Sequence, residues 1–184
     1  MDETKLDQAR SHYIQSLTET LELYGLSPSM GLLYGTMLFQ DRPLTLDEMC
    51  QQTGMSKTSM STGVRELSRL KLVKKKWERG VRKDLYEAEH DLIRAFIDYF
   101  VYLWEQEIEI NKKGLVQTER TIRKLLASGE LTEAENAEAQ KDLEKVATAK
   151  IYYAWLHELS HFFQNDEVMK QIQVTEEMVK RLFP

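Results

Sequence analysis

The sequence predicts a mainly α-helical fold that includes one small β-hairpin. Glycine occurs 8 times and proline 3 times among 184 residues, so residues that interrupt helices are scarce. Over most of the chain, apolar residues recur at steps of three and four, which is the spacing of an amphipathic helix. Residues 72–88 depart from this spacing and contain two short runs around a glycine, as in a β-hairpin.

The N-terminal part of the chain is expected to form two helices. The first ends near Gly25 and has an apolar face made of Leu6, Ala9, Tyr13, Leu17 and Leu21. Ser27 or Ser29 caps the second helix, which continues to Phe39. Pro43 lies just beyond and prevents this helix from extending further.

Two shorter helices are expected next. Thr45 and Glu48 have the spacing of a capping box, which starts a third helix. Gly54 ends this helix in a tight turn, and Ser56 caps a fourth helix that runs to about Lys71. The lengths and order of these pieces are those of a helix-turn-helix.

A basic hairpin follows the fourth helix. Strands are expected over residues 72–77 and 84–88, and Gly80 between them can adopt the positive φ of a tight turn. The hairpin and the helices before it together predict a winged helix-turn-helix over residues 27–90.

Helical spacing then returns in a long segment. One helix is expected from Asp91 to about Ala127, with Gly114 as a point where it could bend or break. Its apolar stripe consists of Leu92, Phe96, Phe100, Leu103 and Ile110. We therefore expect this stripe to be the buried face of the helix.

Two more helices complete the prediction. Thr132 and Glu135 repeat the capping-box spacing and start a helix to Phe163, and a last helix is expected over residues 167–182. These helices have no obvious second domain to pack on, which favours pairing with another copy of the chain. The expected dimerisation regions are residues 1–26 and 91–184.

The charge of the chain is concentrated in one window. Residues 56–83 carry ten Lys or Arg side chains and two acidic ones, Glu66 and Glu78, although the whole chain has a net charge of −5. The window therefore stands at +8 and the remainder at −13. A charge run alone is more often a solvated surface. Here it coincides with the helix-turn-helix and the hairpin, so the expected partner is double-stranded DNA.

The fourth helix is expected to enter the major groove. Met60, Val64 and Leu67 mark its buried face. The opposite face combines small hydroxyls with cations, which suits contacts to base edges and phosphates: Lys57, Thr58, Ser59, Ser61, Thr62, Arg65 and Arg69. On the hairpin, the cations expected to contact the DNA backbone or the minor groove are Lys75, Arg79, Arg82 and Lys83.

Three runs in the central segment carry a family resemblance. They are LYGTM (residues 33–37), MSKTSMSTGVREL (residues 55–67) and RGVRKDLYEAE (residues 79–89). Together they resemble the GbsR type of regulator in the MarR superfamily. The resemblance implies a homodimeric repressor on an inverted-repeat operator that controls genes for choline uptake and glycine betaine synthesis, with choline as a modulator in some members.

An effector with a quaternary ammonium group would require aromatic rings, because cation–π attraction acts where ordinary hydrogen bonding cannot. The candidate ligand-binding residues are Tyr34, Phe39, Trp77, Phe96, Tyr99 and Trp104. Tyr34, Tyr99 and Trp104 are favoured because each ring also carries a polar group. Ordinary core packing is the alternative, since Phe96 and Phe100 lie on the apolar stripe and aromatic residues at helical spacing usually pack.

Residues 157–161 read His-Glu-Leu-Ser-His, the pattern of a zinc protease. His157 and His161 would share a helix face, and Glu158 could activate water. A zinc-dependent hydrolase is therefore one alternative function, but no third ligand is evident nearby, and structural histidines are favoured. A winged helix that binds protein instead of DNA is a second alternative.

Other classes of protein are disfavoured. No run of about 18 apolar residues is present to cross a membrane. Cys50 is the only cysteine, so an internal disulfide is excluded and a cytoplasmic location is expected. No phosphate-binding glycine loop or nucleophile elbow occurs, so we expect no cofactor, no metal and no catalytic residues.

Overall fold

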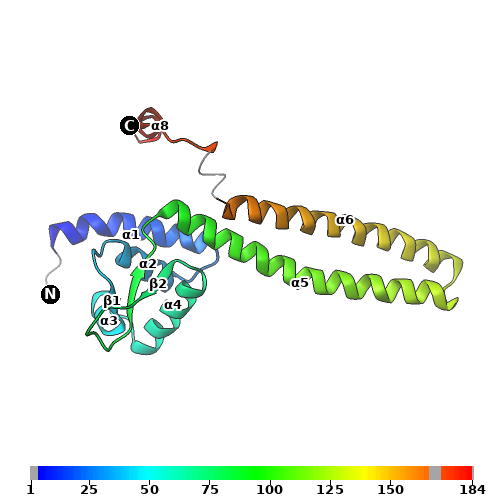
Figure 1. Cartoon of the computed structure of the whole chain (residues 1–184), viewed down its shortest axis with the longest axis horizontal. Coiled ribbons are helices and arrows are strands. Elements are labelled where there is room, and N and C mark those ends of the chain that lie inside the picture. The colour runs from blue at the N-terminus through cyan, green and yellow to red at the C-terminus, as the bar shows by residue number, and fades with distance from the viewer. Residues whose placement is uncertain (1–3, 166–170, 184) are drawn as a thin grey trace. The chain divides into compact units, whose positions relative to one another are not determined.

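The computed structural model describes residues 4–165 and 171–183. The chain forms two compact units, Met1–Tyr99 and Phe100–Pro184. The first contains the helix-turn-helix and its hairpin, and the second is built mainly from two long helices (Figure 1). The predicted fold class, mainly α with a small β-hairpin wing, is confirmed.

Four helices make up most of the first unit. They are α1 (Lys5–Leu23), α2 (Pro28–Leu38), α3 (Leu46–Thr53) and α4 (Lys57–Arg69). The predicted cap of α3 is present: Thr45 Oγ1 accepts from the Glu48 N–H, and the Glu48 carboxylate accepts from the Thr45 N–H. Ser56 caps α4 by accepting from the Ser59 N–H. These local hydrogen bonds set where each helix begins.

Left-handed residues set where α3 and α4 end. Gly54 has a φ of 71° and turns the chain between the two helices. Lys71 has a φ of 60° after α4, where the Leu72 N–H donates back to the Leu67 carbonyl. A side chain in this conformation is uncommon, so α4 ends in a turn that glycine would adopt more easily.

The sheet has one more strand than the hairpin predicted. Strands β2 (Val73–Lys76) and β3 (Leu85–Ala88) pair antiparallel, with Lys76 opposite Leu85. Strand β1 (Leu44–Thr45) pairs with the other edge of β3, giving the order β1-β3-β2 within the described residues. This strand was missed because two residues are too short to show an alternating pattern. Gly80 has a φ of 87° in the hairpin turn, as predicted.

The core of the first unit lies between α2, α4 and the sheet. Leu33 and Met37 from α2 are buried with Met60 and Leu67 from α4. Tyr34 lies among them, and its hydroxyl donates to the Glu89 carbonyl at 2.9 Å. This bond joins α2 to the segment that follows β3.

The long helices of the second unit confirm one predicted cap and show no break at Gly114, where the sequence allowed one. Helix α5 (Leu92–Ser128) begins in the first unit and continues through Gly114 without interruption. Helix α6 (Glu133–Gln164) begins with the Thr132–Glu135 capping box. A lone glycine in a helix costs only about 1 kcal/mol, which the many other hydrogen bonds of a long helix outweigh.

The predicted apolar stripe of α5 is not the buried face. Leu92, Phe96, Leu103 and Ile110 are exposed, whereas Ala95, Ile97, Tyr99, Val101 and Ile108 are buried. The buried residues 95, 97, 99 and 101 recur every two positions, so they cover two sides of the helix, which a search for a single apolar stripe does not predict. Leu92, Leu103 and Ile110 of the predicted stripe are thus exposed on this chain, whereas Phe100 is half-buried, with its ring centroid 6.1 Å from that of Trp104.

The last helix is shorter than predicted. Helix α8 covers Glu176–Leu182, with Thr175 as its cap, and residues 172–175 are not helical. Residues 167–170 of the predicted helix lie outside the described residues. Within the part of the chain that the structure describes, no helix is both long enough and apolar enough to cross a bilayer.

Close approach of α1 and α2 generates the first testable prediction. A Cβ added at Gly31 would lie 2.7 Å from the Cα of Thr18, which only a backbone shift could relieve. Gly31→Ala should therefore destabilise the fold by about 1–3 kcal/mol, measured by urea unfolding. Gly114→Ala is the matched control, because nothing lies within 4 Å of its added Cβ, and it should stabilise by about 0.5–1 kcal/mol. Equal effects of the two variants would contradict the packing described.

Candidate nucleic-acid interface

Helix α4 presents the face that the sequence assigned to DNA. Its apolar side is buried against the first unit through Met60, Val64 and Leu67. Gly63 lies on the same side, where an added Cβ would lie 3.3 Å from a Leu33 methyl group. The predicted contact residues are all exposed on the remaining surface of the helix: Lys57, Thr58, Ser59, Ser61, Thr62, Arg65 and Arg69. Burial of one side thus leaves a continuous polar surface on the other.

The first turn of α4 is fixed by a small hydroxyl network. The Ser56 hydroxyl accepts from the Ser59 N–H and lies 3.0 Å from the Ser59 hydroxyl. Ser59 therefore supports the cap as well as facing outward. Thr58, Ser61 and Thr62 have exposed hydroxyls further from this network. These short side chains let a groove edge approach the helix closely.

The wing carries cations on an exposed hairpin. Lys75 pairs with Asp84 across the hairpin at 2.8 Å, and this pairing raises the pKa of Lys75. Arg79, Arg82 and Lys83 lie in or beside the turn between the strands and are exposed. The turn itself is closed by the Val81 N–H, which donates to the Glu78 carbonyl at 3.2 Å.

Ion pairing divides the ten cations of this surface into two groups. Six pair with carboxylates of the first unit: Lys57, Arg69, Lys74, Lys75, Lys76 and Lys83. The other four have no carboxylate within 4.0 Å among the described residues: Arg65, Lys71, Arg79 and Arg82. Sequence counting treats all ten alike. Arg65, Arg79 and Arg82 are exposed and form no ion pair within 4.0 Å among the described residues, although Glu66 interacts electrostatically with Arg65. Exposed guanidinium groups suit contact with phosphate or guanine.

Asp47 is a site residue that the sequence did not reveal. It lies in the first turn of α3, and its two carboxylate oxygens lie 2.8 Å from Lys57 Nζ and 2.8 Å from Lys83 Nζ. Hydrogen bonds from these two lysines lower the pKa of Asp47 to about 2. One carboxylate thus connects α3, α4 and the wing. In the sequence, Asp47 stands out only as the neighbour of the capping-box residue Glu48, and nothing there indicates its contacts with the two lysines.

Two of the favoured aromatic residues are buried in the first unit. Tyr34 is 2% exposed, its hydroxyl bonds to the Glu89 carbonyl, and burial raises its pKa. Tyr99 is also buried, stacks on Tyr24, and donates from its hydroxyl to the Tyr24 carbonyl at 2.6 Å. The polar groups that favoured these residues as ligands therefore bond to the backbone.

The other aromatic candidates are not gathered into a single cage. Trp77 is 84% exposed on the wing, and Phe96 is exposed on α5. Trp104 belongs to the second unit, where it packs edge-on against Phe163 with ring centroids 5.4 Å apart. Whether any of these residues binds an effector stays a prediction.

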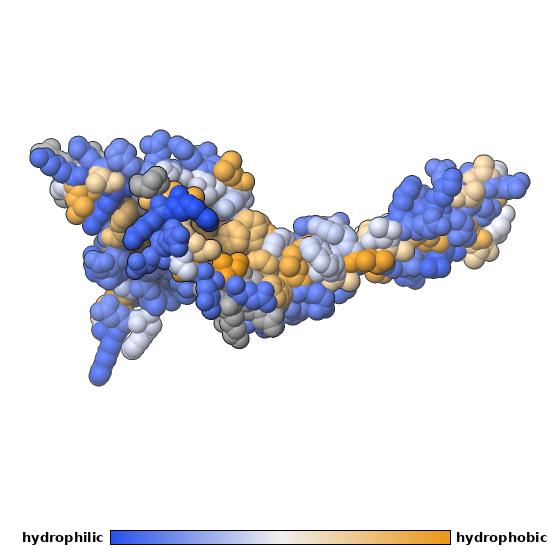
Figure 2. Space-filling view, turned by 90° about the horizontal axis from the view of Figure 1, so that it is seen from above, coloured by the Kyte–Doolittle hydropathy of each residue, from blue (hydrophilic) through white to orange (hydrophobic). Residues whose placement is uncertain are grey.

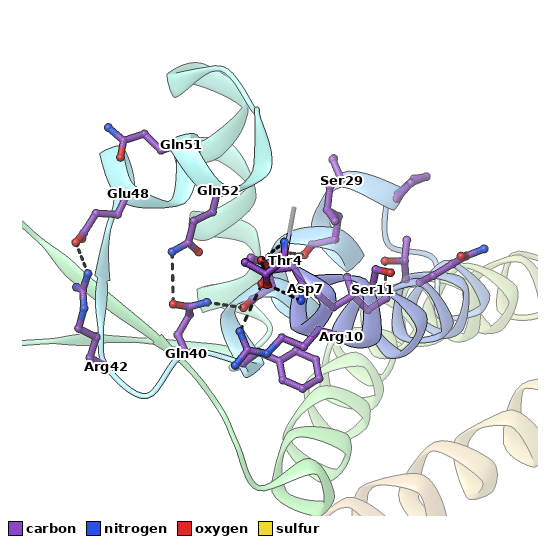
Figure 3. A pocket seen from close by; sticks show the side chains of 17 residues that line it. Thr4, Asp7, Arg10, Ser11, Ser29, Gln40, Arg42, Glu48, Gln51 and Gln52 are labelled. Carbon is purple, nitrogen blue, oxygen red and sulfur yellow. Dashed lines mark hydrogen bonds and ion pairs between the residues drawn. The ribbon is translucent and has the colours of Figure 1, made fainter. Parts of the chain in front are cut away.

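Phe39 lies in a different setting. It lines an open groove of about 1240 Å³ between α1, α2 and α3 (Figure 3). The guanidinium carbon of Arg10 lies over the Phe39 ring, 5.6 Å from its centroid. The Tyr13 and Phe39 rings pack edge-to-face, with centroids 6.1 Å apart. Asp7 lies 3.7 Å from Arg10 and faces the same groove. The ring is therefore already used as a cation–π surface.

The zinc-protease pattern lacks a metal-binding set among the described residues. His157 and His161 lie on one face of α6, with their Nε2 atoms 3.3 Å apart. Glu158 is largely exposed and lies 3.7 Å from His157. No group of three or more His, Cys, Asp or Glu side chains that could hold a metal occurs in residues 4–165 and 171–183. The pair is thus two ligands short of a structural site and one short of a catalytic site.

Comparison with known proteins adds to this geometry. Residues 93–170 match the model of the GbsR family transcriptional regulator, C-terminal helical hairpin. The chain is 40% identical to the HTH-type transcriptional repressor GbsR of Bacillus subtilis (strain 168), covering 92% of this chain and 93% of that protein. It is 33% identical to the repressor OpcR of the same organism, covering 96% and 97%. A crystal structure of a transcriptional regulator shares the fold at 15% identity and a TM-score of 0.51, covering 83% and 99%.

The fold and these relatives define a winged-helix, DNA-binding transcriptional repressor and exclude the hydrolase reading. Identity of 40% over nearly the full length of both chains is decisive for the family. The chain belongs to the GbsR family of transcriptional regulators.

The unpaired arginines generate the second prediction. Arg65→Ala should weaken operator binding by about 1–3 kcal/mol and relax the sequence preference, because a base contact would be lost. Arg82→Ala should weaken all duplexes similarly and reduce the slope of log affinity against log salt by about one. Both are measured by fluorescence anisotropy over a salt series.

Lys112→Ala is the matched control, since it removes one cation from α5 in the second unit. Its affinity for DNA should equal that of the unchanged protein. If Arg65→Ala and Arg82→Ala also leave affinity unchanged, the interface is assigned to the wrong surface.

Proposed function

We propose that this repressor acts as a homodimer on an inverted-repeat operator of osmoprotectant genes, and that choline modulates its binding. The observation that carries the proposal is the 40% identity to the Bacillus subtilis repressor GbsR, together with the exposed cationic face of α4 and the wing. The GbsR-type resemblance implies choline uptake and glycine betaine synthesis genes as the targets.

Geometry supports an inverted repeat as the operator. One winged helix can place one recognition helix in one major groove, which reads only a few base pairs. Two copies related by a two-fold axis would read two half-sites about one helical turn apart. A dimer therefore extends the recognised sequence and matches the symmetry of an inverted repeat.

Apolar surface on the described helices supports the dimer. On α6, Ile151 is 71% exposed and Trp155 is 57% exposed, and Tyr152 stacks on Trp155 with ring centroids 6.4 Å apart. Figure 2 shows hydrophobic side chains reaching the surface along the helices of the second unit. Residues 100–165 bury little of their own apolar surface, mainly Val101, Ile108, Val146 and Leu156. A second copy would cover the exposed faces.

The N-terminal helix contributes to the same argument. Leu6 and Tyr13 from the predicted apolar face of α1 are exposed, whereas Leu21 near its end is buried. The first half of this face is thus available to a partner. We therefore retain residues 1–26 and 91–184 as the proposed dimerisation regions, with the winged helix between them.

The exposed α6 cluster generates the third prediction. Trp155→Glu should raise the dimer dissociation constant at least about thirty-fold, because a buried interface tryptophan typically contributes about 2 kcal/mol or more. Sedimentation equilibrium over a range of protein concentrations measures this constant. Lys145→Ala is the control, since it changes the net charge by the same amount at an exposed α6 residue. A monomeric unchanged protein, or a Trp155→Glu variant that dimerises as before, would contradict the proposal.

The groove at Phe39 is the proposed place for the effector. Its ring already holds a cation, and Asp7 supplies a negative charge beside that cation. A trimethylammonium group could take the position of the Arg10 guanidinium on the ring, with its charge balanced by Asp7. Helices α1, α2 and α3 all line the groove, so a ligand there could alter the orientation of the helix-turn-helix.

Choline binding is the fourth prediction. Calorimetric titration with choline should show saturable binding, and Phe39→Leu should weaken it about three- to thirty-fold, because the aromatic ring is lost while its apolar volume is largely kept. Phe183→Leu is the matched control, because Phe183 is exposed and does not line the groove. DNase footprints of the upstream regions of choline and glycine betaine genes should change in extent when choline is added.

Two outcomes would oppose this part of the proposal. Absence of heat with the unchanged protein would remove choline as the effector. Equal binding by the Phe39→Leu variant would place the site elsewhere. Protection of those upstream regions without choline would still support the repressor and its targets.

A further inference from the structure

Asp47 differs from the other acids paired at this surface because its ion pairs involve two lysines at once. It projects from the first turn of α3 toward the surface that is proposed to meet DNA. The Thr45–Glu48 capping box fixes the helix turn on which it stands. Its Oδ1 contacts Lys57 at the start of α4, and its Oδ2 contacts Lys83 on the wing. A negative charge among DNA-contacting cations requires a physical explanation.

The two contacts resemble those of a phosphate. A carboxylate offers two acceptor oxygens to two ammonium groups, each at 2.8 Å, much as adjacent phosphate oxygens would. Lys57 and Lys83 are both exposed, and Asp47 is itself partly exposed. An exposed ion pair contributes little to stability, so another anion can replace this one at small cost. The pairing is therefore exchangeable.

We propose that Asp47 is an internal competitor of the DNA phosphates, holding Lys57 and Lys83 together in the free protein and releasing them when DNA binds. In the free protein the carboxylate links the wing to the recognition helix. In the complex, the phosphates take both ammonium groups, and the nearby carboxylate remains as a repulsive charge. Asp47 thus lowers the electrostatic part of the affinity for any duplex.

Competition by Asp47 should affect the affinity for unrelated DNA most directly. Binding to unrelated DNA depends almost entirely on contacts between cations and phosphates. A competitor for two of those cations reduces retention on such DNA, where base contacts offer no compensation. Arg79 and Arg82 form no ion pair within 4.0 Å among the described residues, so their contribution is unaffected. Asp47 therefore controls the availability of two of the ten cations, Lys57 and Lys83.

The test is Asp47→Asn in the full chain, which keeps the side-chain shape and removes the charge. Fluorescence anisotropy is measured with an operator duplex and an unrelated duplex over a potassium chloride series. The variant should bind both duplexes about three- to ten-fold more tightly at low salt. The gain in affinity should shrink as salt is raised, because salt screens the repulsion between the Asp47 carboxylate and the phosphates.

Asp142→Asn is the matched control, because it removes the same charge from an exposed α6 pair with Lys145 in the second unit. It should leave affinity unchanged. A second control places Asp47→Asn in a Lys57→Gln, Lys83→Gln background, where the effect should disappear. Circular dichroism and urea unfolding establish that each variant is folded, since an acid in the first turn also supports a helix.

Three outcomes would overturn the inference. Weaker binding by Asp47→Asn would mean that the carboxylate orients the lysines for DNA instead of competing with it. Unchanged binding would mean that the pair is irrelevant, and equal tightening by Asp142→Asn would assign the effect to net charge alone. The inference rests on the proposed DNA interface, and failure of that interface is seen separately, as absence of binding by the unchanged protein at low salt.

Discussion

Burial of one side of α4 is the constraint on which the interface depends. Met60, Val64 and Leu67 are almost completely buried, and Gly63 lets the helix approach Leu33 closely. Rotation of α4 about its axis would expose these side chains at a cost of about 1.5–3 kcal/mol each. The outward direction of Arg65 and the hydroxyl residues is therefore a consequence of packing. Any contact that α4 makes with DNA inherits this orientation.

Ion pairing then determines which of the cations on this outward surface are available to DNA. Ten cations lie in a window of 28 residues, and a count of charge suggests a uniformly attractive surface. Six of them pair with carboxylates, and the cations that are exposed without an ion pair among the residues described are Arg65, Lys71, Arg79 and Arg82. Asp47 on α3 forms ion pairs with both Lys57 of α4 and Lys83 of the wing, and so links these two elements. The affinity of such a surface depends on which cations are already satisfied.

The long helices leave apolar side chains exposed on a single chain. A helix in water needs one apolar side covered, yet α5 and α6 expose Ile110, Ile151 and Trp155. On a single chain these exposed apolar side chains would favour non-specific association with other molecules. In the proposed dimer, a symmetric partner would cover these side chains and would also place two recognition helices on one duplex. The proposed dimer and its inverted-repeat operator would then both follow from one exposed face.

Much of the fold was predictable because its signals are local. Capping boxes at Thr45 and Thr132, the turn at Gly54 and the buried face of α4 all depend on residues three or four positions apart. The sequence by itself determined the order of helices and hairpin and the side of α4 that faces outward. Strand β1, the exposed stripe of α5 and the ion pair between Asp47 and Lys83 were decided only by tertiary structure. Asp47 and Lys83 are 36 positions apart, and no local pattern encodes a contact that arises only when distant elements pack together.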